Sequence, residues 1–400
     1  MPSTTRRRLL GASLALAAGA YGVHRLDRGA ADVSFGSWSP ASGTWPLRRY
    51  DPANTAHNPH ASPPRERPTV RERHSVETGA RRPRFRPVVG ADHVAVHGSG
   101  LAVYPRDGGE AVHHDAVDAP LAGFGPDGGL HTARSRADDP DPPLSLVGYG
   151  TDLREAYRVS LGTDDPTGLV VGSREVYVGT ESGRVRAVDP ADGRHWRVDG
   201  AVPALVDGRL YAADASLDGT VGYAERTGLD RRLNPGPDRV WSAGPTDGFP
   251  HPPAVADGRI VVGSRAEGGG VVRGIDADTG EDLWAPRPLG RDVTTPAVVG
   301  VRGYAAVDTG DAGRVVALDL GTGETVWRDS VPWHADSAAV GGDTLVVAGE
   351  GEVGGRVRAY DRANGEVRWT CRLPGRGPDG LALVDERVFV TVGASLYELR

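Results

Sequence analysis

The chain has 400 residues, including 57 glycines and 31 prolines, and 38% of its residues are hydrophobic, which excludes a low-complexity chain and supplies side chains for a core. Every basic residue is an arginine, and charge is unevenly placed: residues 1–90 hold 15 arginines against 6 acidic residues, whereas residues 91–400 hold 31 against 47. The acidic body argues against nucleic-acid binding, because phosphate recognition needs a basic surface.

Residues 1–23 are predicted to be an export signal. Arg6 and Arg7, followed by an apolar run, resemble the twin-arginine motif that addresses folded proteins for export. The run over residues 9–23 is uncharged but shorter than the roughly 20 residues that usually cross a membrane. A small-residue triplet ending at Ala20 is typical of a cleavage site; a buried core helix is the alternative. We expect an exported protein at the cell surface or another extracytoplasmic site, tethered to the membrane if the signal is not cleaved.

Residues 24–44 show no hydrophobic period and are predicted to be a linker. Residues 45–400 are expected to form the folded domain, beginning at the aromatic anchor Trp45. His57 and His60 have a spacing that can ligate a metal on a helix, but no helical pattern and no completing carboxylate surround them. No metal site is therefore predicted there.

The folded domain repeats one motif, in which an aspartate at a strand end is followed by a glycine four residues later and a tryptophan eight residues later. Three copies keep this spacing and a fourth is one residue shorter. The four copies comprise Asp189, Gly193 and Trp196; Asp276, Gly280 and Trp284; Asp319, Gly323 and Trp327; and Asp361, Gly365 and Trp369. Weaker copies have frame positions 105, 149 and 224, and a terminal copy ends at residue 400. The eight frame positions are 35 to 52 residues apart.

The repeat predicts an all-β fold, an eight-bladed β-propeller of four-stranded blades, because β repeats of about forty residues are typical of propellers. The aspartate can accept backbone N–H bonds across the turn, the glycine permits a positive φ, and the tryptophan offers a large face for packing. A second repeated phrase, two strands joined by a glycine turn, occurs at residues 202–224, 252–275 and 295–318. Seven blades are the alternative, since the copies at 149 and 224 are weak.

The terminal copy lacks an outer strand. Residues 69–76 have the alternating pattern of a strand that can replace it. We therefore expect the N-terminal segment to close the last blade by pairing with residues 388–400, which would also protect the sheet edge.

The aspartate, Thr-Gly-Glu and tryptophan pattern at residues 317–327 resembles the repeat of pyrroloquinoline-quinone-type β-propellers, and this resemblance covers most of residues 90–400. The resemblance implies that the motif glycines and tryptophans dock neighbouring blades. One branch of that family comprises quinoprotein dehydrogenases, which hold a quinone over a tryptophan floor and bind calcium. The other branch comprises non-catalytic propellers similar to the lipoprotein subunit of the bacterial outer-membrane barrel-assembly machinery. That branch presents loops to protein partners, although this chain lacks the lipid-bearing cysteine.

Other candidate chemistry is weak in the sequence. Cys371 is the single cysteine, which excludes an intramolecular disulfide, and its place in a strand pattern predicts a small buried hydrophobe rather than a reactive thiol. His113, His114 and Asp115 could supply a base and its orienting carboxylate, but no nucleophile accompanies them, so a degenerate tryptophan position is the preferred interpretation. The acidic residues within 137–143 suggest a solvated loop rather than a calcium site.

These observations predict an exported propeller that acts as a scaffold or binding module for an exported or membrane protein, with no catalysis of its own. We expect no catalytic residues, no metal, no cofactor and no nucleic acid, and a monomer that contacts the membrane only through its N-terminal signal. The alternative is an exported quinoprotein oxidoreductase that acts on alcohols or sugars with pyrroloquinoline quinone and calcium.

Overall fold

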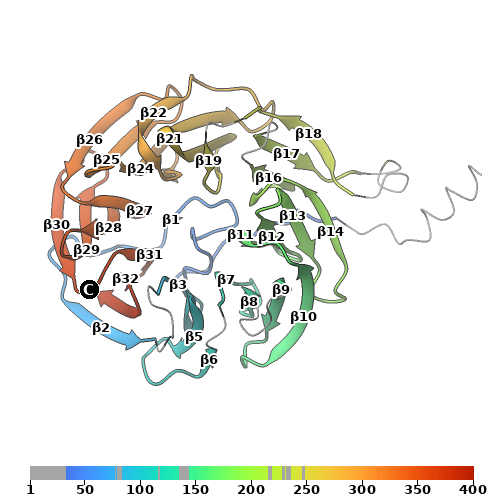
Figure 1. Ribbon diagram of the computed structural model, residues 1–400, viewed down its shortest axis with the longest axis horizontal. Coiled ribbons are helices and arrows are strands. Elements are labelled where there is room, and N and C mark those ends of the chain that lie inside the picture. Colours follow the sequence, from blue (N-terminus) through green and yellow to red (C-terminus); the bar gives the residue numbers. More distant parts are fainter. Residues whose placement is uncertain are drawn as a thin grey trace, which may run out of the picture.

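The computed structural model describes residues 33–76, 78, 83–115, 118–134, 144–214, 219–227, 230, 236–245 and 248–400. Every named element within these residues is a β-strand, and the strands form a ring of sheets around a central axis (Figure 1). The predicted all-β propeller class is confirmed. In the part of the chain described here, no helix has the length and apolar character needed to cross a membrane.

Most sheets consist of consecutive strands, as the two-strand phrases of the sequence predict. The first sheet contains β3 (Phe85–Val89), β4 (His93–Gly98), β5 (Gly100–Pro105) and β6 (His113–Asp115), and the second contains β7 (Leu121–Phe124), β8 (Leu130–Arg134), β9 (Leu144–Tyr149) and β10 (Glu155–Gly162). The third contains β11 (Pro166–Val171), β12 (Val176–Thr180), β13 (Arg184–Val188) and β14 (His195–Asp199). The fourth contains β15 (Val202–Val206), β16 (Arg209–Ala213), β17 (Thr220–Ala224) and β18 (Asp238–Ser242). All pairings within these sheets are antiparallel.

The next sheet has eight strands and contains two of the repeat frames. Its strands are β19 (Phe249–Pro250), β20 (Ala254–Ala256), β21 (Arg259–Asp276), β22 (Arg287–Val293), β23 (Ala297–Val299), β24 (Arg302–Asp308), β25 (Gly313–Asp319) and β26 (Thr325–Val331). The two halves are joined where Asp292 and Val293 of β22 pair with Asp308 and Val307 of β24. Because strand pairing merges these two frames, the number of blades stays a prediction.

The last two sheets incorporate strands from near the N-terminus. One contains β27 (His334–Gly341), β28 (Thr344–Gly351), β29 (Gly354–Asp361), β30 (Val367–Leu373) and the short parallel strand β1 (His57–Asn58); the other contains β31 (Pro378–Val384), β32 (Arg387–Val392), β33 (Ser395–Leu399) and β2 (Val70–Ser75). Strand β2 runs antiparallel to β33, from Val70 opposite Leu399 to Ser75 opposite Ser395. This is the pairing that the sequence predicts for residues 69–76. It joins β2, from the N-terminal part of the chain, to β33 at the C-terminal end in one sheet (Figure 1).

The apolar core lies between neighbouring sheets. Val88 and Leu101 from the first sheet, for example, pack with Phe124 and Leu130 from the second, and all four are at most 3% exposed. A single four-stranded sheet would leave one such face open to water, so the sheets stabilise one another through the ring.

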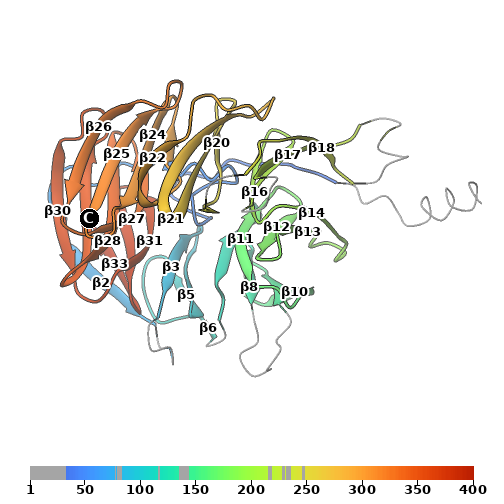
Figure 2. The same cartoon turned by 45° about the horizontal axis from the view of Figure 1, so that its top comes forward.

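The segment before β2 crosses the interior of the ring instead of forming a linker up to residue 44. Figures 1 and 2 show this blue segment running inside the circle of sheets. Phe35 is fully buried, and the indole of Trp38 donates a hydrogen bond to the carbonyl of Val171 at 2.8 Å. The ordered domain therefore begins by residue 33. Hydrophobic periodicity did not predict an ordered structure for residues 33–44, because single side chains such as Phe35 and Trp38 fix this stretch and no regularly spaced apolar face does.

Candidate functional site

The motif turns have the geometry that their residue types predict. Asp319 shows the arrangement: its carboxylate accepts hydrogen bonds from the backbone N–H groups of Gly321 (2.9 Å) and Thr322 (3.2 Å). Its carbonyl accepts one from Gly323 at 2.8 Å. The motif glycines all have positive φ, between 69° and 77°, at Gly193, Gly280, Gly323 and Gly365. The aspartate therefore serves the turn rather than a reaction.

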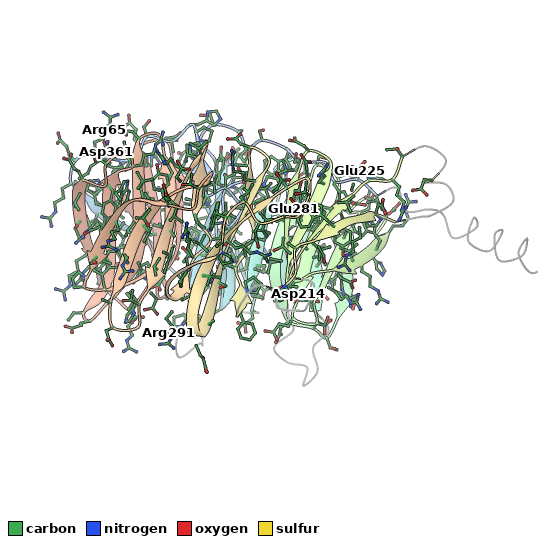
Figure 3. All side chains as sticks on the ribbon, turned by 90° about the horizontal axis from the view of Figure 1, so that it is seen from above. Arg65, Asp214, Glu225, Glu281, Arg291 and Asp361 are labelled. Atoms are coloured by element: carbon green, nitrogen blue, oxygen red, sulfur yellow. The ribbon has the colours of Figure 1, made fainter. Side chains whose placement is uncertain are left out.

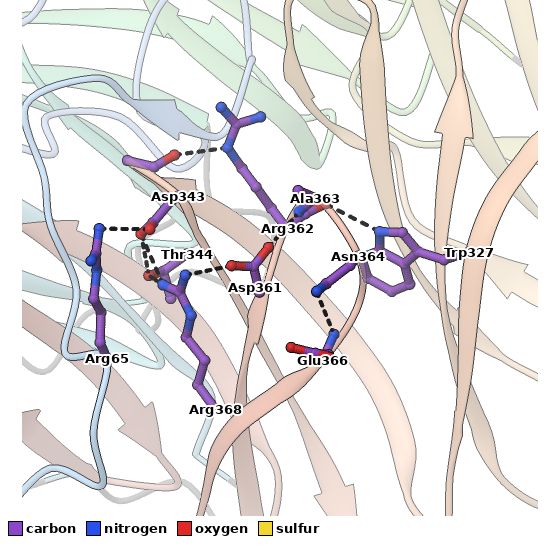
Figure 4. A network of polar contacts seen from close by, with 11 residues as sticks. Arg65, Trp327, Asp343, Thr344, Asp361, Arg362, Ala363, Asn364, Glu366 and Arg368 are labelled. Atoms are coloured by element: carbon purple, nitrogen blue, oxygen red, sulfur yellow. Dashed lines mark hydrogen bonds and ion pairs between the residues drawn. The ribbon is translucent and has the colours of Figure 1, made fainter.

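Three motif glycines each contact the indole ring of a tryptophan from the preceding unit. A Cβ atom at these glycines would lie 2.5 to 2.6 Å from an indole carbon, closer than real Cβ contacts. Each indole N–H also donates a 3.1 Å hydrogen bond to a carbonyl of the same turn. The pairs are Trp241 on Gly280 with Ala277 O, Trp284 on Gly323 with Leu320 O, and Trp327 on Gly365 with Arg362 O. Figure 4 shows the last of these.

Trp241 is a docking residue that the sequence analysis missed. It follows frame position 224 by seventeen residues, so it falls outside the eight-residue spacing used to find the copies. Two other motif tryptophans lie elsewhere. Trp369 donates to the carbonyl of Pro64 in the N-terminal segment at 2.6 Å, and Trp196 donates to Glu175 at 3.1 Å and packs against Phe35. At Trp369 and Trp196, residues of the N-terminal segment thus make the contact that the turn of a neighbouring unit makes with the other docking tryptophans.

An ion-pair network anchors the N-terminal segment beside the last complete motif (Figure 4). Arg368 pairs with both Asp343 and Asp361 at 2.8 Å, and Arg65 pairs with Asp343 at 2.6 Å. The hydrogen bond from Arg368 is the main cause that lowers the pKa of Asp343 to about 2. Arg65 is largely exposed, so its pair adds little stability by itself and mainly orients the segment.

The N-terminal segment hydrogen-bonds through its backbone to successive sheets around the ring. Backbone N–H groups of the sheets donate to its carbonyls at 2.7 to 2.9 Å, from Ser173 to Gly36, Phe124 to Pro46, Leu205 to Pro52, Val255 to Ala53, Val298 to Thr55 and Val340 to Ala56. In addition, Trp45 pairs with Val89 in both directions at 2.8 Å. The segment therefore closes one end of the central channel with a hub of backbone contacts.

Two buried asparagines complete this hub. Asn54 adopts a positive φ of 57°, and its amide donates to the carbonyls of Pro203 and Pro253. The amide of Asn58, which is fully buried, donates to Thr44 O at 3.1 Å and to Leu383 O at 2.8 Å. Each amide bridges two segments that are distant in sequence, which fixes the path of the chain across the channel.

A cavity of 420 Å³ opens on the other side of this hub. The N-terminal segment forms its floor with Trp45, Arg48, Arg49 and Ala56, and the sheets that contain β3, β22, β27 and β31 form its walls. Arg291 at its rim lies on the face of the ring opposite Arg65 (Figure 3). The lining is rich in charged residues, with the arginines 48, 49, 84, 86, 265 and 291 and the carboxylates of Asp292, Asp308, Asp336, Glu350 and Asp379.

Several of these carboxylates have local partners or a raised pKa. Asp292 lies 2.6 Å from His251, and Asp308 lies 3.0 Å from His334. Burial raises the pKa of Asp336 to about 7 and that of Asp379 to about 6. At neutral pH the cavity is therefore less negative than its five carboxylates suggest.

The remaining sequence candidates lie apart from this cavity. His57 belongs to β1, where burial lowers its pKa to about 4, and among the described residues no group of three or more potential ligands is placed to hold a metal. The carboxylate of Asp115 pairs with Arg134, while His113 packs edge-on against Tyr149. Cys371 is buried, as predicted, at 3% exposure. Arg6, Arg7 and the acidic loop 137–143 lie outside the described residues.

The cavity residues do not fit a quinone stacked on a tryptophan over calcium. The tryptophan of this cavity, Trp45, is only 1% exposed and packs against Tyr50, so it offers no free face to a flat ligand.

Comparison with solved structures agrees with the fold described above. The chain is similar to a computationally designed protein, Ika8 (TM-score 0.64, 15% identity, 82% of this chain and 99% of that chain). It is also similar to BamB from Moraxella catarrhalis (0.54, 17%, 83% and 100%) and to quinohemoprotein alcohol dehydrogenase from Comamonas testosteroni (0.58, 14%, 89% and 80%). At these identities the likeness shows the fold alone. No curated protein matches the sequence.

The strand order and the glycine–tryptophan docking define a PQQ-like β-propeller. The family model described as outer membrane protein assembly factor BamB matches residues 182–330 and 311–399. These ranges together span more than half of the chain, so the protein belongs to this family.

Proposed function

We propose that the protein is an exported, monomeric scaffold that presents one face of its propeller to an exported or membrane-bound protein partner. The observation that carries the proposal is the hub: residues 33–64 cross the ring and bind successive sheets through their backbone, and the cavity rich in charged residues lies on the other side of this segment. Membership in a family named for an outer-membrane assembly factor supports a protein-binding role. It also supports an extracytoplasmic location, which we propose that the protein reaches through the signal at Arg6 and Arg7.

The open face offers an aromatic contact for such a partner. Phe249 in β19 is 75% exposed and lies two residues before His251 of the cavity wall. Large exposed aromatic side chains are common anchors in protein interfaces. Val301, which is 49% exposed in the turn between β23 and β24, lies next to the hub side and provides a matched position.

Photo-crosslinking in the producing cell tests this proposal. A photoreactive amino acid at position 249 is expected to give a discrete adduct with one exported or membrane protein, identified by mass spectrometry, and the same group at position 301 to give none. Adducts of equal intensity and identity at both positions, or no adduct from the open face, would contradict the assignment of the binding face. An R6K/R7K variant is expected to accumulate inside the cell, and unchanged export would exclude the twin-arginine route.

The quinoprotein alternative is tested separately. The scaffold proposal predicts that calcium adds nothing to any effect of pyrroloquinoline quinone on the thermal unfolding midpoint of the purified protein. A stabilisation by the quinone that requires calcium and grows with ligand concentration would instead favour the oxidoreductase.

A further inference from the structure

The cavity on the open face contains two arginines without a carboxylate partner. Arg48 projects from the floor and is exposed to the cavity, and Arg86 in β3 is half-buried in the wall. Among the described residues neither side chain forms an ion pair within 4.0 Å, and the Nε of Arg86 is buried without a hydrogen-bond partner. Guanidinium groups that protein surrounds normally have an acceptor, because five N–H donors are costly to leave unsatisfied.

The two guanidinium groups also repel each other. The charge of Arg86 is the main cause that lowers the pKa of Arg48 well below its usual range, and burial adds to it. Asp379 attracts Arg86, but it forms an ion pair with Arg84, at 4.0 Å, and not with Arg86. The fold therefore places two arginines whose positive charges repel each other in one cavity, an arrangement that a bound anion would relieve.

Two of the five cavity carboxylates are engaged by other groups, and Asp379, which attracts Arg86, does not form an ion pair with it within 4.0 Å. Asp292 and Asp308 are engaged by histidines at 2.6 and 3.0 Å, on the walls formed by β22 and β24. The ring of His97 lies near both arginines, is fully buried, and is kept neutral because burial lowers its pKa to about 3. The charge at the floor of the cavity is thus positive.

We propose that this cavity binds a small organic anion, a carboxylate or a phosphate ester, through the guanidinium groups of Arg48 and Arg86. Planar guanidinium groups match both carboxylate and phosphate oxygens and form charge-assisted hydrogen bonds with them. The volume of 420 Å³ falls in the range of small-ligand sites and accommodates a group the size of a tricarboxylate or a sugar phosphate. The site is formed by the chain alone, so binding is independent of any protein partner.

The test measures anion binding to the purified exported chain by calorimetry and thermal unfolding, with citrate and inorganic phosphate as probes and chloride at equal ionic strength as reference. We expect saturable binding of at least one probe. The variants R48Q and R86Q should each weaken it about tenfold or more, the loss expected for one charge-assisted hydrogen bond. R154Q is the matched control, because Arg154 lies on an exposed turn 3.6 Å from Asp152 and should bind like the wild type.

Two further readouts separate a binding role from a structural one. Without anion, R48Q is expected to raise the unfolding midpoint, because it removes the repulsion with Arg86, whereas a merely structural arginine would lower it. R48K keeps the charge and should retain part of the affinity, which covers the case in which R48Q fails to fold.

Stronger binding of citrate assigns a carboxylate ligand, and stronger binding of phosphate assigns a phosphate ester. The proposal is overturned if neither probe binds beyond chloride, or if the R48Q/R86Q double variant binds as well as the wild type.

Discussion

Replacement of Gly323 by alanine tests whether the glycine–tryptophan contact holds neighbouring units together. Two costs add. Alanine at a φ of 69° is strained by about 1 kcal/mol. The new Cβ would lie 2.5 Å from the ring of Trp284, which must shift. Such overpacking costs about 1–3 kcal/mol, and loss of the 3.1 Å indole bond to Leu320 adds about 1 kcal/mol. We expect a total loss of about 3–5 kcal/mol in the free energy of unfolding.

The control separates the contact from backbone strain. Gly258 has a φ of 70°, but a Cβ there meets nothing within 4 Å, so its replacement by alanine should cost only about 1 kcal/mol. Urea-induced unfolding followed by circular dichroism measures both variants. In a Trp284→Ala background, Gly323→Ala should fall to the cost seen at Gly258, because the overlap is gone. Equal losses at Gly323 and Gly258 in the wild-type background would refute the docking role.

Three further predictions concern the hub, the closing strand and the cavity. Asn58→Ala should cost about 2–3 kcal/mol, because it leaves buried carbonyls such as that of Leu383 without a donor, and thermal unfolding measures this loss. Glu398→Ala should cost about 3 kcal/mol, since Glu398 is buried and lies 3.1 Å from Arg73 of β2; adding Arg73→Ala should then change the urea midpoint little. Burial raises the pKa of Asp379 from 3.8 to about 6, so the folded state binds its proton more tightly and wild-type stability should fall as the pH rises between these values. Asp379→Asn should remove that dependence, and its stabilisation relative to the wild type, about 3 kcal/mol, should be constant above pH 6 in urea titrations.

The sequence predicted the repeating unit well because the information in that unit is local. An aspartate, a glycine with positive φ and a tryptophan within nine residues describe one turn and the strand after it, and the structure shows that turn at Asp319 and Gly323. The spacing did not identify Trp241 because an insertion before β18 separates it from its frame position. Its indole nevertheless contacts Gly280, as the other docking tryptophans contact their glycines. Spacing is therefore a reliable guide only where no residues are inserted.

The hub and the cavity could not be predicted from spacing at all. The N-terminal segment uses its backbone carbonyls as acceptors, and a backbone group leaves no residue pattern in the sequence. The cavity is formed by residues as distant as Arg48, Arg86 and Asp379, which only the closed ring brings together. Both features arise from contacts between segments that are far apart in the chain, and a single sequence contains no direct record of them.

The structure shows that the basic N-terminal part of the chain forms ion pairs with the acidic remainder. The N-terminal 90 residues carry an excess of arginine and the remainder an excess of acid, and the two parts meet in pairs such as Arg65 with Asp343 and Arg73 with Glu398. The backbone hub fixes the path of the segment, and these pairs then match its charge to the sheets. Arg48 and Arg86 belong to the same basic part, yet in the described residues no carboxylate pairs with either of them. The fold therefore places these two unpaired arginines in the cavity on the other side of the hub, where a ligand from outside the chain can reach them.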